Sequence, residues 1–233
     1  RLSWATAVEI NNDGFDVEIA QIFVWTSTDP HTSYTTSDDY LNNFQINRPT
    51  FTGRLGHFLT TRNIGAGGRA YIDVLCDNDN NYGFSNINTT YQSYPTYSWT
   101  VEVVTHELGH NFGSPHTQSC SWPVGALDNC YPVEGSCSAG PAPTNGGTIM
   151  SYCHLASYGI NFTNGFGPYP KALIRSKLNY AMCLPLASGS TTIANSCSPT
   201  TLNPNNTYGM GPASVSMHHI ISSTGTGEEG VFT

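Results

Sequence analysis

The segment His106-Glu-Leu-Gly-His110 is the part of this sequence whose residue types and spacing can do chemistry. If it is helical, residues four positions apart lie about 40° apart around the axis, so both imidazoles can reach one metal ion. Glu107 lies about 100° from His106, where its carboxylate can take a proton from a water at the metal without becoming a ligand. The pattern therefore predicts a zinc ion with a neighbouring general base.

A catalytic zinc site needs a third protein ligand and an open position. We favour His116, because it follows His110 by six positions, which is too short for another packed element. Gly113 between them can take the backbone angles that end a helix and turn the chain back. Glu134, in a loop flanked by proline and glycine, is the alternative. The predicted zinc ligands are His106, His110 and His116.

A helix that carries this site must turn one face to a core and the other to a cleft. Ser98 is a candidate N-cap, and Val104 and Leu108 recur about 200° from the histidines. A second helix is predicted with Ser37 as its N-cap, and a last one to run from Pro170 to before Pro185. Alternation of apolar and polar residues predicts strands over Val17–Trp25, Arg54–Thr61 and Arg69–Leu75.

The composition is that of an ordered protein with few charges. Charged residues make up 10% of the 233 residues, and the net charge of -8 includes no basic block. Binding to nucleic acid or to an anionic membrane surface is therefore not expected. No apolar run approaches the roughly 20 residues of a membrane span.

Cysteines and the residues around them predict a disulfide-tied region. Because histidines supply the metal ligands, the seven cysteines are best explained as disulfides formed in an oxidising compartment. Glycine, proline, serine, asparagine and cysteine dominate from Asn111 to Asn164, which predicts irregular structure. We therefore expect a secreted, extracellular protein whose signal peptide and any pro-segment lie outside this sequence.

The stretch from His106 to His116 resembles the zinc signature of the metzincin metalloproteases. It is most similar to the reprolysin-like (adamalysin) branch, whose signature also favours Gly109, Asn111 and Gly113. The later segment Thr148-Ile-Met-Ser-Tyr152 is similar to the Met-turn, in which a methionine, here Met150, lies beneath the three histidines. Without the resemblance, an ordinary core methionine would be an equally good interpretation.

The resemblance implies an α+β fold and a division of the chain. Residues 1–185 would form a metzincin catalytic domain with a twisted mixed sheet, an active-site helix, a C-terminal helix and an irregular, disulfide-tied lower subdomain. Arg1–Asn12 is more similar to the first helix of the family than to its first strand, so the first strand is expected to lie outside the sequence. Residues 186–233 form a tail rich in Ser, Thr and Asn, which resembles the start of a β-rich accessory module of secreted bacterial proteases, with a strand over Ala213–Ile221.

The resemblance also implies an activity. The chain would be a secreted, monomeric zinc endopeptidase that cuts extended polypeptides, with Glu107 as general base. The substrate would pair antiparallel with an edge strand that includes Gly68, Arg69, Ala70 and Tyr71. Tyr152 resembles a tyrosine that astacins and serralysins bring to the metal; it would stabilise the transition state, or else simply pack.

Disulfide pairings come from the same resemblance. The family often joins the cysteine after the edge strand to one in the final helix, which suggests Cys76 with Cys183. For the remaining cysteines we expect Cys120 to pair with Cys153 and Cys130 with Cys137.

Other interpretations of the sequence remain open. The chain could belong to another metzincin branch, pappalysin-like or serralysin-like, or be a zinc-stabilised binding module without catalysis.

Thr117 stands where reprolysins usually have Asp, so the support of the Met-turn must differ. The segment Asp77-x-Asp-x-Asn81 could bind calcium, although a polar surface turn is the favoured interpretation.

Overall fold

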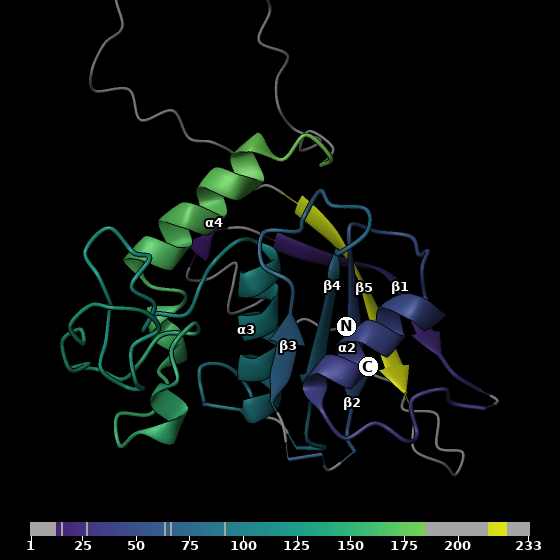
Figure 1. Ribbon diagram of the computed structural model, residues 1–233, viewed down its shortest axis with the longest axis horizontal. Helices are drawn as coiled ribbons and strands as arrows, with labels where there is room; N and C mark the ends of the chain where they lie inside the picture. Colours follow the sequence, from purple (N-terminus) through teal and green to yellow (C-terminus); the bar gives the residue numbers. More distant parts are fainter. Residues whose placement is uncertain are drawn as a thin grey trace, which may run out of the picture.

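The computed structural model describes residues 13–14, 16–26, 28–62, 64–65, 67–90 and 92–184, together with the backbone of 214–222. A mixed five-stranded sheet with the order β1-β5-β2-β4-β3 forms its centre (Figure 1). Three neighbouring pairs, β1 with β5, β5 with β2 and β2 with β4, are parallel, while the edge strand β3 runs antiparallel to β4. The bounds are β1 Asp16–Val24, β2 Leu55–Thr60, β3 Gly68–Ala70, β4 Tyr82–Asn86 and β5 Ser214–Ser222.

The two faces of the sheet carry different cores. Helix α2 (Ser37–Asn47) packs its Tyr40 and Phe44 against alternate residues of β2 and β4, Phe58 and Phe84, in an aromatic cluster. The intervening residues of β2 belong to a larger aliphatic core with helix α3 (Trp99–Asn111). Because side chains alternate along a strand, β2 packs against α2 on one face and against α3 on the other.

The helices begin and end close to the predicted positions. Thr36, not Ser37, caps α2, since its hydroxyl accepts a hydrogen bond from Asp39 N at 3.1 Å. Ser98 holds the N-cap position of α3 but makes no capping bond with its side chain. Helix α4 (Pro168–Tyr180) has proline in its first turn, where the missing N–H costs nothing.

The predicted edge strand is too long, and one strand was not predicted. After β3, Asp73 takes a φ of +62°, and the N–H groups of Asp73 and Val74 donate to the carbonyls of His110 and Asn111. This segment therefore follows the end of α3 and does not continue the strand. The unpredicted strand β4 lies next to β3; its glycine, serine and asparagine hid the usual strand pattern.

The region between α3 and α4 is irregular, as predicted, with two short 3-10 turns, Cys153–Leu155 and Phe162–Asn164. The disulfide between Cys76 and Cys183 is formed as the resemblance implies. The other two expected pairings are wrong, because the bonds join Cys120 to Cys137 and Cys130 to Cys153. The reason is a parallel bridge between Ser119 and Glu134, which lays the chain before Cys137 alongside Cys120.

Strand β5 agrees with the predicted strand over Ala213–Ile221 to within one residue at each end. It lies in the sheet between β1 and β2, so one segment beyond residue 185 belongs to the same sheet. The domain boundary at residue 186 stays a prediction, and the expected helical segment Arg1–Asn12 lies outside the described residues. None of the helices described is long and apolar enough to cross a bilayer.

His31 gives the aromatic cluster a dependence on pH. Its ring is fully buried against Trp25, Tyr34 and Phe58, and neither ring nitrogen has a hydrogen-bond partner among the described residues. Burial lowers the pKa of His31 to about 4, although the carboxylate of Asp29 acts in the opposite direction.

We predict that His31→Phe flattens the acid side of the stability profile. Between pH 4 and about 6.5 the unfolded chain binds a proton at this position that the folded protein resists, so stability rises with pH. The wild-type free energy of unfolding should gain up to about 3 kcal/mol more than that of the variant across this window. Denaturant unfolding at pH 4 to 7 measures it, and parallel profiles would contradict the assignment.

Candidate metal centre

Helix α3 carries the first part of the candidate site. The carboxylate of Glu107 and the rings of His106 and His110 project from a helix whose residues from Thr100 to Asn111 are all buried. The opposite side of the helix holds Val104 and Leu108 in the aliphatic core. Because the helix is fixed on that side, the two histidines have little freedom in direction.

The turn that follows α3 brings the third histidine back. Gly113 has a φ of +101°, a conformation that residues with a Cβ rarely adopt. Its N–H donates to the His110 carbonyl at 2.8 Å, and Ser114 N donates to the Gly109 carbonyl at 2.9 Å. These bonds satisfy the last carbonyls of the helix and reverse the chain toward His116.

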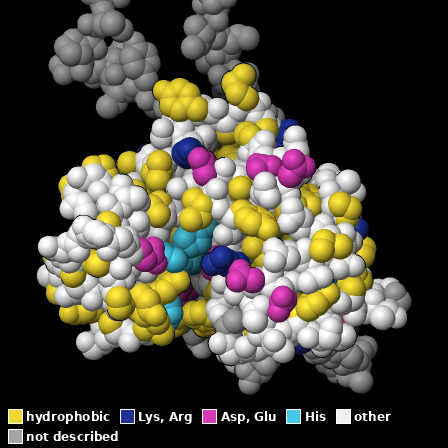
Figure 2. Space-filling model, in the orientation of Figure 1, with side chains coloured by type: hydrophobic (Ala, Val, Ile, Leu, Met, Phe, Trp, Pro, Cys, Tyr) yellow, Lys and Arg dark blue, Asp and Glu magenta, His cyan; other side chains and the backbone are white. Residues whose placement is uncertain are grey.

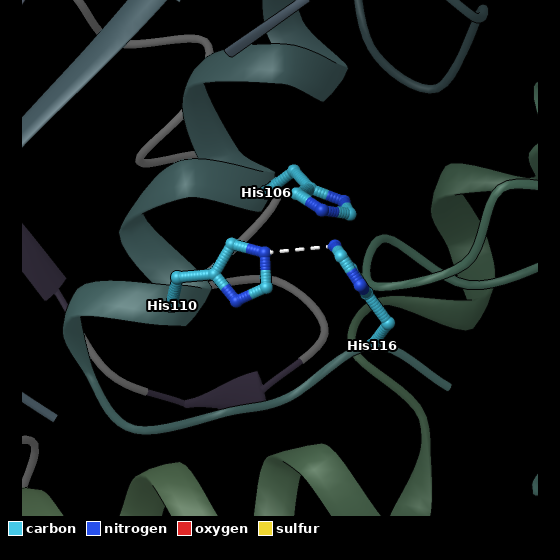
Figure 3. Close-up of side chains that lie close together, drawn as sticks. All are labelled: His106, His110 and His116. Atoms are coloured by element: carbon cyan, nitrogen blue, oxygen red, sulfur yellow. Dashed lines mark hydrogen bonds between the residues drawn. The ribbon is translucent and has the colours of Figure 1, made fainter. Parts of the chain in front are cut away.

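The three histidines converge on one point (Figure 3). His110 Nε2 and His116 Nε2 are 3.0 Å apart, and each of the three residues offers a ring nitrogen within 4.8 Å of the others. Three imidazole nitrogens at such spacing form a suitable ligand set for zinc, with a position left for water or substrate. Figure 2 shows histidine side chains in a hollow of the surface, and the side chain of His116 is 19% exposed.

Each histidine is held from behind by an oxygen atom. His106 Nδ1 donates to the Ile149 carbonyl and His110 Nδ1 to the Ser114 carbonyl, both at 2.7 Å. His116 Nδ1 donates to Glu134 Oε1, also at 2.7 Å. A proton held on Nδ1 leaves the lone pair on Nε2, which is the arrangement that metal-binding histidines need.

Electrostatics keep two of these rings in the form that binds metal. Burial, followed by the neighbouring histidines, lowers the pKa of His106 well below its usual value. Burial and the proximity of His116 lower the pKa of His110 to about 3. Neutral imidazole is the ligand form, so the residues present fit a zinc ion.

Glu107 lies at the wall of the cleft. Its side chain lies against Gly68, the first residue of β3, and burial raises the pKa of its carboxyl well above the usual value, while Arg69 acts in the opposite direction. A cation held by the three histidines would also favour the carboxylate. The carboxylate and the edge strand therefore face the same space.

Met150 lies beneath the helix. Its sulfur lies against Gly109, where a Cβ would overlap it, so glycine is required for this contact. The Met150 carbonyl accepts from Thr117 N at 3.1 Å and from Thr117 Oγ1 at 3.5 Å. The residue that departs from the reprolysin pattern thus supports the turn through its main chain and hydroxyl.

Two side chains that the sequence offered as possible metal ligands, Glu134 for zinc and Asp77 for calcium, make other contacts in the structure. Glu134, the alternative third ligand, orients His116 from behind, a role that nothing in the sequence signals. Asp77 accepts from the N–H groups of Asp79 and Asn80, as a residue that forms a surface turn does. This arrangement favours the turn over a calcium site.

Comparison with known proteins decides the family. The model of metallo-peptidase family M12, in its reprolysin form, matches residues 4–162, which is more than half of the chain. The chain belongs to this family. No curated protein matches the chain. Membership of the reprolysin-like metzincins makes this M12 protein a metallopeptidase, a zinc-dependent hydrolase of polypeptides.

The contact between Glu134 and His116 can be tested for its contribution to zinc binding. We predict that Glu134→Ala raises the zinc Kd by about 10-fold to 100-fold, the usual effect of removing a partner of a ligand histidine. Competition with a coloured chelator measures this Kd. Glu18→Ala, an exposed glutamate on β1, is the control. Equal affinity in all three proteins would show that the contact does not support His116.

Proposed function

We propose that the chain is a secreted zinc endopeptidase that hydrolyses extended polypeptides. One observation carries the proposal: the side chains of His106, His110 and His116 converge, with Glu107 beside them at the wall of an open cleft. Three disulfides among the described residues favour an oxidising, extracellular location. A catalytically silent zinc module would have no use for a carboxylate in this place.

In this proposal the three histidines would hold zinc through their Nε2 atoms, because their Nδ1 atoms are hydrogen-bonded. When bound, zinc supplies a Lewis acid that lowers the pKa of a water and polarises the scissile carbonyl. Glu107 accepts the proton of the attacking water on a carboxylate oxygen and then delivers it to the leaving amine. Met150 packs against Gly109 of helix α3, which carries two of the histidines. The carbonyl of Ile149 accepts the hydrogen bond from His106 Nδ1.

The edge strand β3 provides a place for the substrate backbone. It lies at the end of the sheet, with β4 on one side and no other strand of the described sheet on its free side. Gly68, Arg69 and Ala70 therefore offer main-chain groups to an extended peptide, which would bind antiparallel. Tyr71 lies beyond the strand, and its hydroxyl donates to Asn42 and Gln45 of α2, so it fixes the end of the strand.

Tyr152 is placed to assist the reaction. Its ring centroid lies 4.7 Å from that of His116 and 5.8 Å from that of His106. Burial and the charge of Glu107 raise its pKa to about 12, so its hydroxyl keeps the proton and can donate a hydrogen bond. We propose that it donates to the oxygen of the scissile carbonyl as negative charge develops there.

The direct test is cleavage of casein by the purified protein, with and without a zinc chelator. We predict that Glu107→Gln keeps the bound zinc, because no ligand changes, but lowers cleavage by about 10² to 10⁴-fold, the range for a general base. Metal analysis and proteolysis rates measure both. Glu18→Gln should behave as the wild type. A Glu107→Gln protein with a near-normal rate would remove Glu107 from this role.

We predict that Tyr152→Phe lowers kcat by about 10² to 10³-fold with little change in KM, because the lost hydrogen bond forms chiefly in the transition state. Steady-state cleavage of a fluorogenic peptide measures both constants. Tyr131→Phe is the matched control, since the Tyr131 ring packs against Tyr152 at 5.0 Å. An unchanged kcat in Tyr152→Phe would reduce Tyr152 to a packing role.

A further inference from the structure

A pocket opens beside the zinc site and contains a second buried carboxylate. Its volume is about 520 Å³, and its lining includes His106 and Glu107 of the site as well as Glu102. Glu102 lies one helical turn before His106 and is only 1% exposed. No step of the proposed reaction uses it.

Glu102 has neutral or weakly basic partners. Tyr97 donates its hydroxyl to Glu102 Oε2 at 2.5 Å, and His154 Nδ1 lies 2.8 Å from Glu102 Oε1. No lysine or arginine is among the described residues that line the pocket. Arg69, on the edge strand, is paired with Asp38 at 2.8 Å. Each oxygen of Glu102 thus has a polar neighbour, but no lysine or arginine balances its charge within the pocket, so the pocket favours a cation.

The walls suit a long side chain with a charged end. Trp99, Val103 and Leu155 line the pocket with apolar surface, which can cover the methylene groups of lysine or arginine. The ring of His154 lies 5.4 Å from that of Trp99, so the basic partner and the aromatic wall are neighbours. An aromatic face also attracts a cation.

The direction in which the substrate runs along β3 determines which of its residues faces the pocket. Glu107 lies against Gly68, so bond cleavage takes place beside the start of β3. A peptide antiparallel to β3 passes its later residues along the chain that precedes Gly68. Gly65 and Gly67 of that segment line the pocket. The pocket therefore faces the residue that follows the cleaved bond.

We propose that Glu102 makes the enzyme select a lysine or arginine side chain on the carboxyl side of the cleaved bond. The stem of that side chain lies along Trp99 and Val103, and its charged end meets the carboxylate of Glu102 beside His154. An apolar residue at the same position leaves the buried carboxylate without a cation. This inference rests on the proposed peptidase function and adds its substrate class.

Peptides that differ only at the residue after the cut test the proposal. We expect kcat/KM for Lys or Arg to exceed that for Leu by about 10-fold to 100-fold, the size of one charge-assisted hydrogen bond. In Glu102→Gln the ratio should fall toward one, because the amide keeps the shape and loses the charge. Glu18→Gln, the same change on an exposed residue, should keep the wild-type ratio.

The outcomes separate this inference from the proposed function. Wild-type cleavage without preference for a basic residue would overturn the role of Glu102 and leave the peptidase intact. A lower melting temperature of Glu102→Gln with an unchanged ratio would show a purely structural role and also overturn it. No chelator-sensitive cleavage of casein by the zinc-loaded wild type would overturn the proposed function, and this inference with it.

Discussion

The site depends on three hydrogen bonds from histidine Nδ1 atoms to oxygen atoms behind them. The acceptors come from three separate places: the turn after α3, the segment of Met150 and the loop of Glu134. Each bond fixes a tautomer and a ring direction at once, so the Nε2 lone pairs meet at one point. The chain between α3 and α4 is therefore the scaffold of the site, although it has little regular structure.

That scaffold places Ile149, Met150 and Phe166 in the aliphatic core, and two disulfides add covalent restraints to it. The Cys130–Cys153 bond ties a loop to the segment just after Tyr152, and the Cys120–Cys137 bond closes the loop that contains Glu134. Both disulfides thus restrain segments that supply a partner to the histidines.

The sequence predicted the parts of the fold that follow from local periodicity. The active-site helix, its apolar face and the turn at Gly113 depend on residues within one short stretch, and the structure has them as expected. Strand β4 is defined by its pairing with β2 and β3, and the role of Glu134 by its contact with His116. These partners lie elsewhere in the chain, so the local sequence of β4 or around Glu134 does not predict the pairing or the contact. The two exchanged disulfides fail for the same reason, because a bridge between distant segments decides them.

Helix α3 holds two buried glutamates in a chain with few charges, and their surroundings give them different tasks. Glu102 has its oxygens near a tyrosine hydroxyl and a histidine ring, which hold the carboxylate in one place. Glu107 has no such pair among its described contacts, and burial raises its pKa. A fixed carboxylate suits recognition of a charge, and one whose proton affinity is raised suits proton transfer. In the proposed function, five positions along one helix would thus separate the residue that selects the substrate from the residue that transfers the proton.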